Sequence, residues 1–152
     1  MAEEKTIWLM VLDYVQDELE TSLGPEVIVQ QGRRNAKSVL LEKDTDRAVF
    51  LVRGSETDRN NGIQSDRTSV TFFVECWARE DDPNASRVYV KISGLEYKVN
   101  EILKRIKRVS GMIETDFQLM DLNVVDRRGD NGSQRPFFGT QFEVVVEISD
   151  NR

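Results

Sequence analysis

The chain has 152 residues, of which 39% are hydrophobic and 32% charged, and its formal net charge is −6. These values are typical of one globular domain, residues 1–152, that folds without disulfides or metal, and the negative charge disfavours a sequence-independent nucleic-acid binder. The sequence contains one cysteine and no histidine, which excludes an internal disulfide and any Ser-His or Cys-His mechanism and removes the commonest transition-metal ligand.

A first helix is predicted from about Lys5 to Leu23. Gly24 and Pro25 end it, because glycine accepts the left-handed cap conformation and proline cannot continue a helix. The residues before the helix are net acidic and its first apolar run is short, so we expect no signal peptide. No segment reaches the roughly 20 apolar residues of a membrane helix, so we expect no membrane partner. The apolar residues that share one helix face are Trp8, Val11, Leu12, Val15 and Leu19.

Three strands are predicted before the next helix. A short strand covers about Glu26 to Gln31, and a second covers about Arg47 to Arg53. The clearest strand covers Ser69 to Arg79, where residues alternate between two faces with a period of two. Between the last two lies a polar segment, Gly54 to Arg67, which we predict to be a loop. It is long for a connection between strands, and such loops are usually functional.

A long amphipathic helix is predicted from about Ala85 to Val109. Gly94 lies in its middle at a cost of about 1 kcal/mol against alanine, so we expect close backbone packing there. The helix carries seven basic residues against two glutamates. We interpret this concentration as a solvated face, with contact to an acidic neighbour or to nucleic acid as alternatives. The apolar positions alternate at spacings of four and three, as in a helix laid along a sheet: Val88, Ile92, Leu95, Val99, Ile102 and Ile106.

Two strands, about Phe117 to Asp126 and Phe137 to Ser149, complete the chain. Strands clustered in this way, without a βαβαβ rhythm, predict the α+β class. We expect a mainly antiparallel β-sheet with the N-terminal helix and the long helix packed on one face.

The remaining features that suggest chemistry have structural interpretations. Neighbouring carboxylates such as Asp81 and Asp82 are typical of turns. The run from Gly129 to Gly132 lacks the lysine and the following helix of a phosphate-binding loop, which favours a hairpin turn. Cys76 lies in the clearest strand, where we expect a buried, unreactive side chain. The sequence therefore predicts no catalytic residue, cofactor or metal ion, and we interpret the protein as a non-enzyme.

The two polar loops are the best candidates for a protein interface. The first is Gly54 to Arg67, and the second is Arg127 to Arg135. Loops on a rigid sheet are where recognition residues concentrate, although ordinary loops without a role fit the composition equally well. The interface residues that we predict are Asp58, Arg59, Asn60, Arg67, Arg127, Arg128 and Asp130.

The layout resembles the tail-terminator, or tail-completion, proteins of long-tailed phages, the group that includes the lambda tail terminator. The resemblance covers nearly the whole chain, but it is one of order and pattern without a diagnostic motif. The segment 31–46 departs from the family pattern, which often has a proline-rich approach to the second strand. The features that carry the resemblance are the helix that ends in Leu23-Gly24-Pro25, the alternating run from Asp66 to Ala78, the passage from Asp81 to Ala85 into the long helix, and the final segment Arg135 to Val144.

The resemblance implies a structural role in the virion neck, assembled in the host cytoplasm. Proteins of this family form a ring, usually a homo-hexamer, that caps the tail tube and joins it to the head-side connector or stopper protein. DNA only passes through the ring, and the negative net charge would suit a channel in which DNA slides without sticking. The alternative is an intracellular adaptor or chaperone-like module that holds a partner at its sheet edge or helix face.

Overall fold

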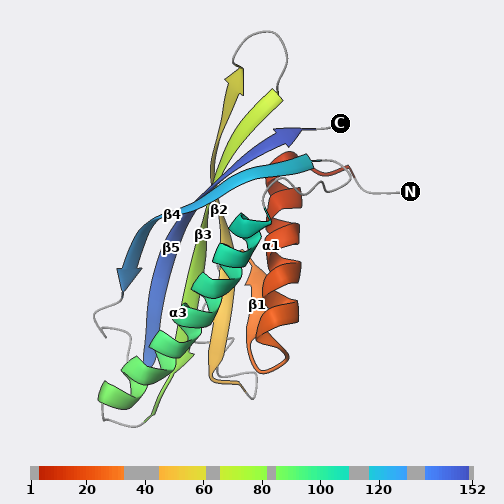
Figure 1. The fold of residues 1–152 in the computed structure, drawn as a ribbon. Helices are drawn as coiled ribbons and strands as arrows, with labels where there is room; N and C mark the ends of the chain where they lie inside the picture. Colours follow the sequence, from red (N-terminus) through yellow and green to blue (C-terminus); the bar gives the residue numbers. More distant parts are fainter. Residues whose placement is uncertain are drawn as a thin grey trace.

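A computed structural model describes residues 4–32, 45–60, 66–81, 85–109, 117–129 and 136–150, with the backbone alone at 58–60, 66, 85 and 150. Figure 1 shows a layer of helices on one side of a strongly twisted sheet. The predicted α+β class and the predicted order of elements are confirmed. The elements are α1 (Ile7–Leu23), β1 (Ile28–Gln31), β2 (Arg47–Asn60), β3 (Asp66–Arg79), α3 (Ala85–Arg108), β4 (Phe117–Gly129) and β5 (Phe137–Asp150).

The five strands form one sheet in the order β1-β2-β3-β5-β4. The pairs β2–β3, β3–β5 and β4–β5 are antiparallel, and β1 alone runs parallel to its neighbour β2. The expected mainly antiparallel sheet is therefore confirmed.

The main core lies between this sheet and the two helices, both of which pack on the same face of the sheet. The apolar stripes predicted for both helices face this core, and α1 ends at Gly24, whose φ is +79° and whose N–H donates to the carbonyl of Glu20. Burying each large apolar side chain contributes roughly 1.5–3 kcal/mol, which outweighs the weak intrinsic preferences of single residues. Fully buried side chains of this core include Leu19, Leu51, Phe72, Leu95, Leu103 and Phe142.

The segment predicted as a loop, 54–67, is strand over most of its described part. β2 continues to Asn60 and β3 begins at Asp66, and the register pairs Thr57 with Ser69. The prediction was wrong because this end of the hairpin has no alternation of apolar and polar residues. Figure 1 shows that it rises beyond the helices, so neither face needs an apolar set.

Two further expectations are corrected. β4 continues through Arg127 and Arg128 to Gly129, so the second predicted loop begins later than expected, and its remainder lies outside the described residues. Gly94 is not closely packed: a Cβ placed there would have no described atom within 4 Å. Close approach occurs instead at Gly54, beside an irregularity in the β2–β3 register, where an added Cβ would overlap the carbonyl oxygen of Thr71.

Candidate functional site

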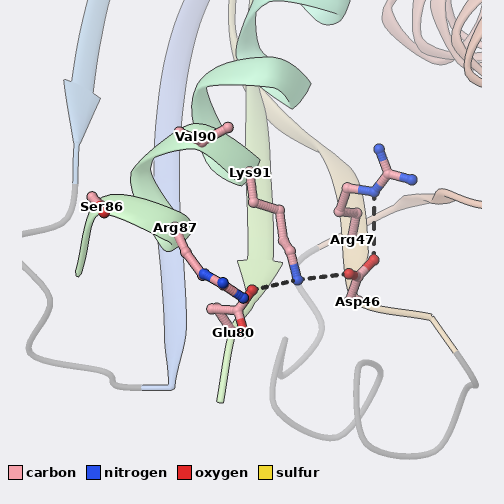
Figure 2. A pocket seen from close by; sticks show the side chains of 7 residues that line it. All are labelled: Asp46, Arg47, Glu80, Ser86, Arg87, Val90 and Lys91. Carbon is pink, nitrogen blue, oxygen red and sulfur yellow. Dashed lines mark ion pairs between the residues drawn. The ribbon is translucent and has the colours of Figure 1, made fainter. Parts of the chain in front are cut away.

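A cavity of about 490 Å³, open to solvent, lies where the first turns of α3 pass the ends of β2 and β3 (Figure 2). The antiparallel pairing of β2 and β3 brings the first residues of β2 beside the last residues of β3, and α3 then returns over both. Most of the residues that line the cavity are charged. The lining consists of Asp46, Arg47, Glu80, Ser86, Arg87, Val90 and Lys91.

The charged groups of the cavity form ion pairs, with Lys91 at the centre. Figure 2 shows its side chain between Asp46 and Glu80, with Nζ–O distances of 2.7 and 3.0 Å. The same Nζ donates to the backbone carbonyl of Arg79 at 2.9 Å. Arg47 lies 3.4 Å from the Asp46 carboxylate on its other side. Three chain segments far apart in sequence are joined here by one ammonium group.

The pKa shifts agree with this geometry. Burial by itself raises the pKa of Asp46, but the hydrogen bond and charge of Lys91 outweigh it, and the pKa falls below its ordinary value. Burial alone would lower the pKa of Lys91, but the two carboxylates raise it above the ordinary value. Lys91 therefore stays protonated at neutral pH and does not act as a nucleophile or base, which both need a free amine. The arrangement is suited to clamping α3 onto the strand ends.

Other candidates for chemistry do not form a site in the described ranges. No group of three or more histidine, cysteine, aspartate or glutamate side chains in these ranges is placed to hold a metal ion. Cys76 is fully buried, as expected from its place in the strand. Burial, followed by the nearby carboxylates of Glu96 and Glu75, raises the pKa of its thiol well above the ordinary value, which disfavours the reactive thiolate.

The predicted interface residues fall into two groups that the structure does not bring together. Residues 58–60 and Arg67 lie on the β2–β3 hairpin, where Arg67 is exposed and the side chains of 58–60 are outside the description. Arg127 and Arg128 are exposed on β4, opposite Phe142 and its neighbour on β5. Arg67 lies opposite Ser149, so the two groups are roughly 23 Å apart along β5. Residue 130 lies outside the described ranges.

The two arginines on β4 have partners within the chain. Arg127 donates to the side-chain oxygen of Asn100 at 2.9 Å, and its guanidinium carbon lies 5.6 Å from the ring centroid of Phe142. Arg128 makes a 2.8 Å ion pair with Asp126. Each arginine therefore has a local structural role, and their predicted role in an interface stays a prediction.

The basic residues of α3 are largely engaged with acidic and polar groups of the same chain. Arg105 lies 3.0 Å from the carboxylate of Glu18 and 2.7 Å from the hydroxyl of Ser22 on α1. Lys107 donates to the side-chain oxygen of Asn123 on β4 at 2.9 Å. Together with Lys91, these contacts hold α3 to α1, β2 and β4. The acidic groups that the basic residues of this helix contact therefore belong in part to the same chain.

One surface was missed in the sequence: the side of α3 that faces away from the sheet. Three large side chains are exposed there, with 58% of Tyr89, 74% of Val90 and 68% of Tyr97 accessible. The outward face of a helix in a globular protein is normally polar. The sequence does indicate this surface. Residues at spacings of three and four lie on the face opposite the buried stripe, namely Val90, Ser93, Gly94 and Tyr97.

The face of the sheet that points away from the helices is the second exposed surface. No helix of the described ranges packs on it, because both helices share the main core on the other face. A small buried cluster of Ala48, Phe50 and Phe137 covers one end of it. Farther along, the alternation of β3 and β5 directs Phe73, Val145 and two glutamates, Glu143 and Glu147, to this face.

Comparisons with known proteins identify the fold. Neither a protein-family model nor a curated protein sequence matches the chain. Among solved structures, it is similar to the sheath/tube terminator of an extracellular contractile injection system, PVC, in its extended state, with a TM-score of 0.54 and 13% identity. The match covers 99% of this chain and 59% of that chain, so this protein spans less than two thirds of its length. At this identity the likeness shows a shared fold.

Within the described ranges, every helix is too short or too polar to cross a membrane.

Proposed function

We propose that the protein is a tail terminator, a structural component that caps the tube of a phage tail or of a related injection machine. The observation that carries the proposal is the match of nearly the whole chain to the fold of a sheath/tube terminator. It agrees with the resemblance noted in the sequence, which rests on different features. The ion pairs of the cavity are in keeping with a structural role, because the central lysine is held protonated between two carboxylates.

The finer parts of the proposal concern assembly and position. We infer that copies form a closed ring, a hexamer in the usual form, that contacts the tail tube on one side and the head-side connector or stopper on the other. A ring requires a heterologous contact, in which two different surfaces of the same chain meet. The lambda-like subtype is the narrowest form of the proposal, and the similar structure, which belongs to a contractile system, does not favour it. Virion neck location and DNA passage through the ring follow from the same proposal.

Electron microscopy of tail tubes tests the terminator role directly. Purified tube fragments from the same genome would be incubated with gold-labelled protein and imaged in negative stain. The proposal predicts label at one end of each tube and tubes that no longer elongate when free tube protein is added. A matched incubation with the protein unfolded by heat controls for non-specific label. Label along the whole tube, or tubes that elongate normally without label, would contradict the proposal and favour an adaptor function.

A further inference from the structure

The outward side of α3 has the composition of a protein contact. Tyr89, Val90 and Tyr97 are each more than half exposed, and tyrosine is enriched in the cores of interfaces. Ser93 and Gly94, which have small side chains, lie between them on the same side of the helix. Two tyrosines and a valine gathered on one exposed side of a helix are typical of a contact surface.

This surface, which we name the α3 stripe (Tyr89, Val90, Ser93, Gly94 and Tyr97), is bordered by positive charge. Lys98 follows Tyr97, is exposed, and makes no ion pair within the described part of the chain. A carboxylate on the partner surface would offset this charge. The stripe is therefore suited to an apolar surface with negative charge.

The outer sheet face has that chemistry. We define it by Phe73, Val145, Glu143 and Glu147, which are all half-buried and lie on neighbouring strands. Phe73 is directly opposite Glu143, and Val145 lies between the two glutamates on the same side of β5. Glu143 carries the negative charge that the argument uses, because Glu147 already has an interaction within the chain and the nearest arginine on β4, Arg128, is paired with Asp126. The outer sheet face is thus apolar with negative charge, and no helix of the described ranges covers it.

We propose that the α3 stripe of one copy packs on the outer sheet face of a second copy. Within one molecule the two surfaces cannot meet, because α3 lies on one side of the sheet and the outer sheet face is on the other. Between molecules they are complementary in charge, and each bound copy still presents one surface of each kind. The contact is heterologous, helix layer on sheet layer, and it repeats from copy to copy. The inference rests on the proposed function, since it assigns the surfaces that close the proposed ring.

Single substitutions in the stripe provide the first test. Val90→Asp places a carboxylate in the apolar part of the contact, and we expect an apparent dissociation constant about 30-fold higher or more. Val109→Asp is the matched control, because it makes the same change on the same helix at the exposed residue just after α3. Light scattering and analytical ultracentrifugation, with and without tube fragments, measure assembly. Because Val90 also lines the cavity around Lys91, Tyr97→Glu repeats the test at an exposed position outside that lining, and it replaces Val90→Asp if that variant does not unfold cooperatively. Equal assembly of stripe and control variants would overturn the inference.

A mixing experiment tests which surfaces meet. The helix-side variant is Val90→Asp, and the sheet-side variant is Val145→Asp, which also places a carboxylate in its surface, so that the two altered surfaces repel each other. Each variant alone should stay monomeric. A 1:1 mixture should form dimers and no larger species, because the one intact stripe and the one intact outer sheet face are both used in the dimer contact. Absence of dimers in the mixture would overturn the pairing of these two surfaces.

The outcomes separate the inference from the proposed function. If the wild-type protein forms rings and caps tubes, and Val90→Asp does so equally well, only the assignment of the surfaces fails. If the wild-type protein neither forms rings nor caps tubes at any concentration, the proposed function fails. Loss of ring formation in Val90→Asp, with normal assembly of Val109→Asp and dimers in the mixture, supports both.

Discussion

Replacing the lysine at the centre of the cavity tests whether the charged cluster clamps α3 to the sheet. Lys91→Met keeps most of the side-chain length and removes the ammonium group that contacts Asp46, Glu80 and the carbonyl of Arg79. It also removes the cation that lies between the two carboxylates, while Arg47 stays beside Asp46. Lys98→Met on the same helix is the matched control, because Lys98 is exposed and has no ion pair in the described ranges.

The expected loss in the free energy of unfolding follows from how exposed Lys91 and its carboxylate partners are. A hydrogen bond to a charged group contributes roughly 1.5–3 kcal/mol when buried, whereas an exposed ion pair contributes about 0.2–1 kcal/mol. The side chain of Lys91 is 25% exposed and that of Asp46 is 47% exposed, so solvent screens the first pair substantially. We expect Lys91→Met to lower the free energy of unfolding by about 2 kcal/mol, which corresponds to a Tm lower by about 4–8 °C for a domain of this size.

The pH dependence gives the prediction a second signature. The pKa of Asp46 is lowered in the folded state, so its contribution is present above its unfolded pKa of about 3.9 and is lost as the pH falls through the folded value. The pKa of Lys91 is raised, so its contribution is present below about 10.4 and is lost as the pH rises through the folded value. The difference between wild type and Lys91→Met should therefore be largest from about pH 5 to 9 and shrink on both sides.

Urea unfolding followed by tryptophan fluorescence is a suitable assay, because Trp8 and Trp77 report on α1 and on β3. The clamp is refuted if Lys91→Met and Lys98→Met differ by less than about 0.5 kcal/mol, the range expected for ordinary surface substitutions. It is also refuted if the difference between wild type and Lys91→Met is the same at pH 3 as at pH 7.

Gly54→Ala should lower the free energy of unfolding by about 1–3 kcal/mol, because its Cβ would overlap the carbonyl oxygen of Thr71, whereas Gly94→Ala should raise it by up to about 1 kcal/mol. Thermal unfolding measures both, and effects of the same sign would show that one of the two environments is misjudged. The Cys76 thiol should react with an aromatic disulfide reagent only in urea, and reaction of the folded protein at the unfolded rate would contradict its burial. Because the folded pKa of Cys76 is raised, the unfolded chain loses its thiol proton first, and stability should fall as the pH rises above about 8.5 in wild type but less in Cys76→Ala.

Local chemistry and hydrophobic periodicity were enough to predict much of the fold. The cap at Gly24 follows from the residue type alone, and the stripes of both helices follow from their spacing. The same reasoning failed beyond Gly54, because a strand pair outside the helix layer needs no apolar face and leaves no periodic signal. It failed at Gly94 because a glycine in an exposed helix position does not by itself indicate packing.

The candidate surfaces were less accessible to sequence reasoning, because they depend on topology. Lys91 and Asp46 are far apart in the chain, and only the return of α3 over the end of β2 brings them within 2.7 Å. The burial of Cys76 was predictable, since it shares the apolar face of its strand with Val74 and Ala78. In the sequence, the α3 stripe is indicated by the large side chains of Val90 and Tyr97 opposite the buried face of the helix. Interpreting it as a contact surface also requires knowing which face of the sheet no helix covers.

The mass of the assembled protein, alone and with tail-tube protein from the same genome, tests the central claim most directly. Light scattering coupled to gel filtration measures it without any label. The tail-terminator account predicts a closed ring of about six copies, formed by the protein alone or on contact with the tube. A monomer that remains monomeric at every concentration and is indifferent to tube and connector proteins would contradict the account.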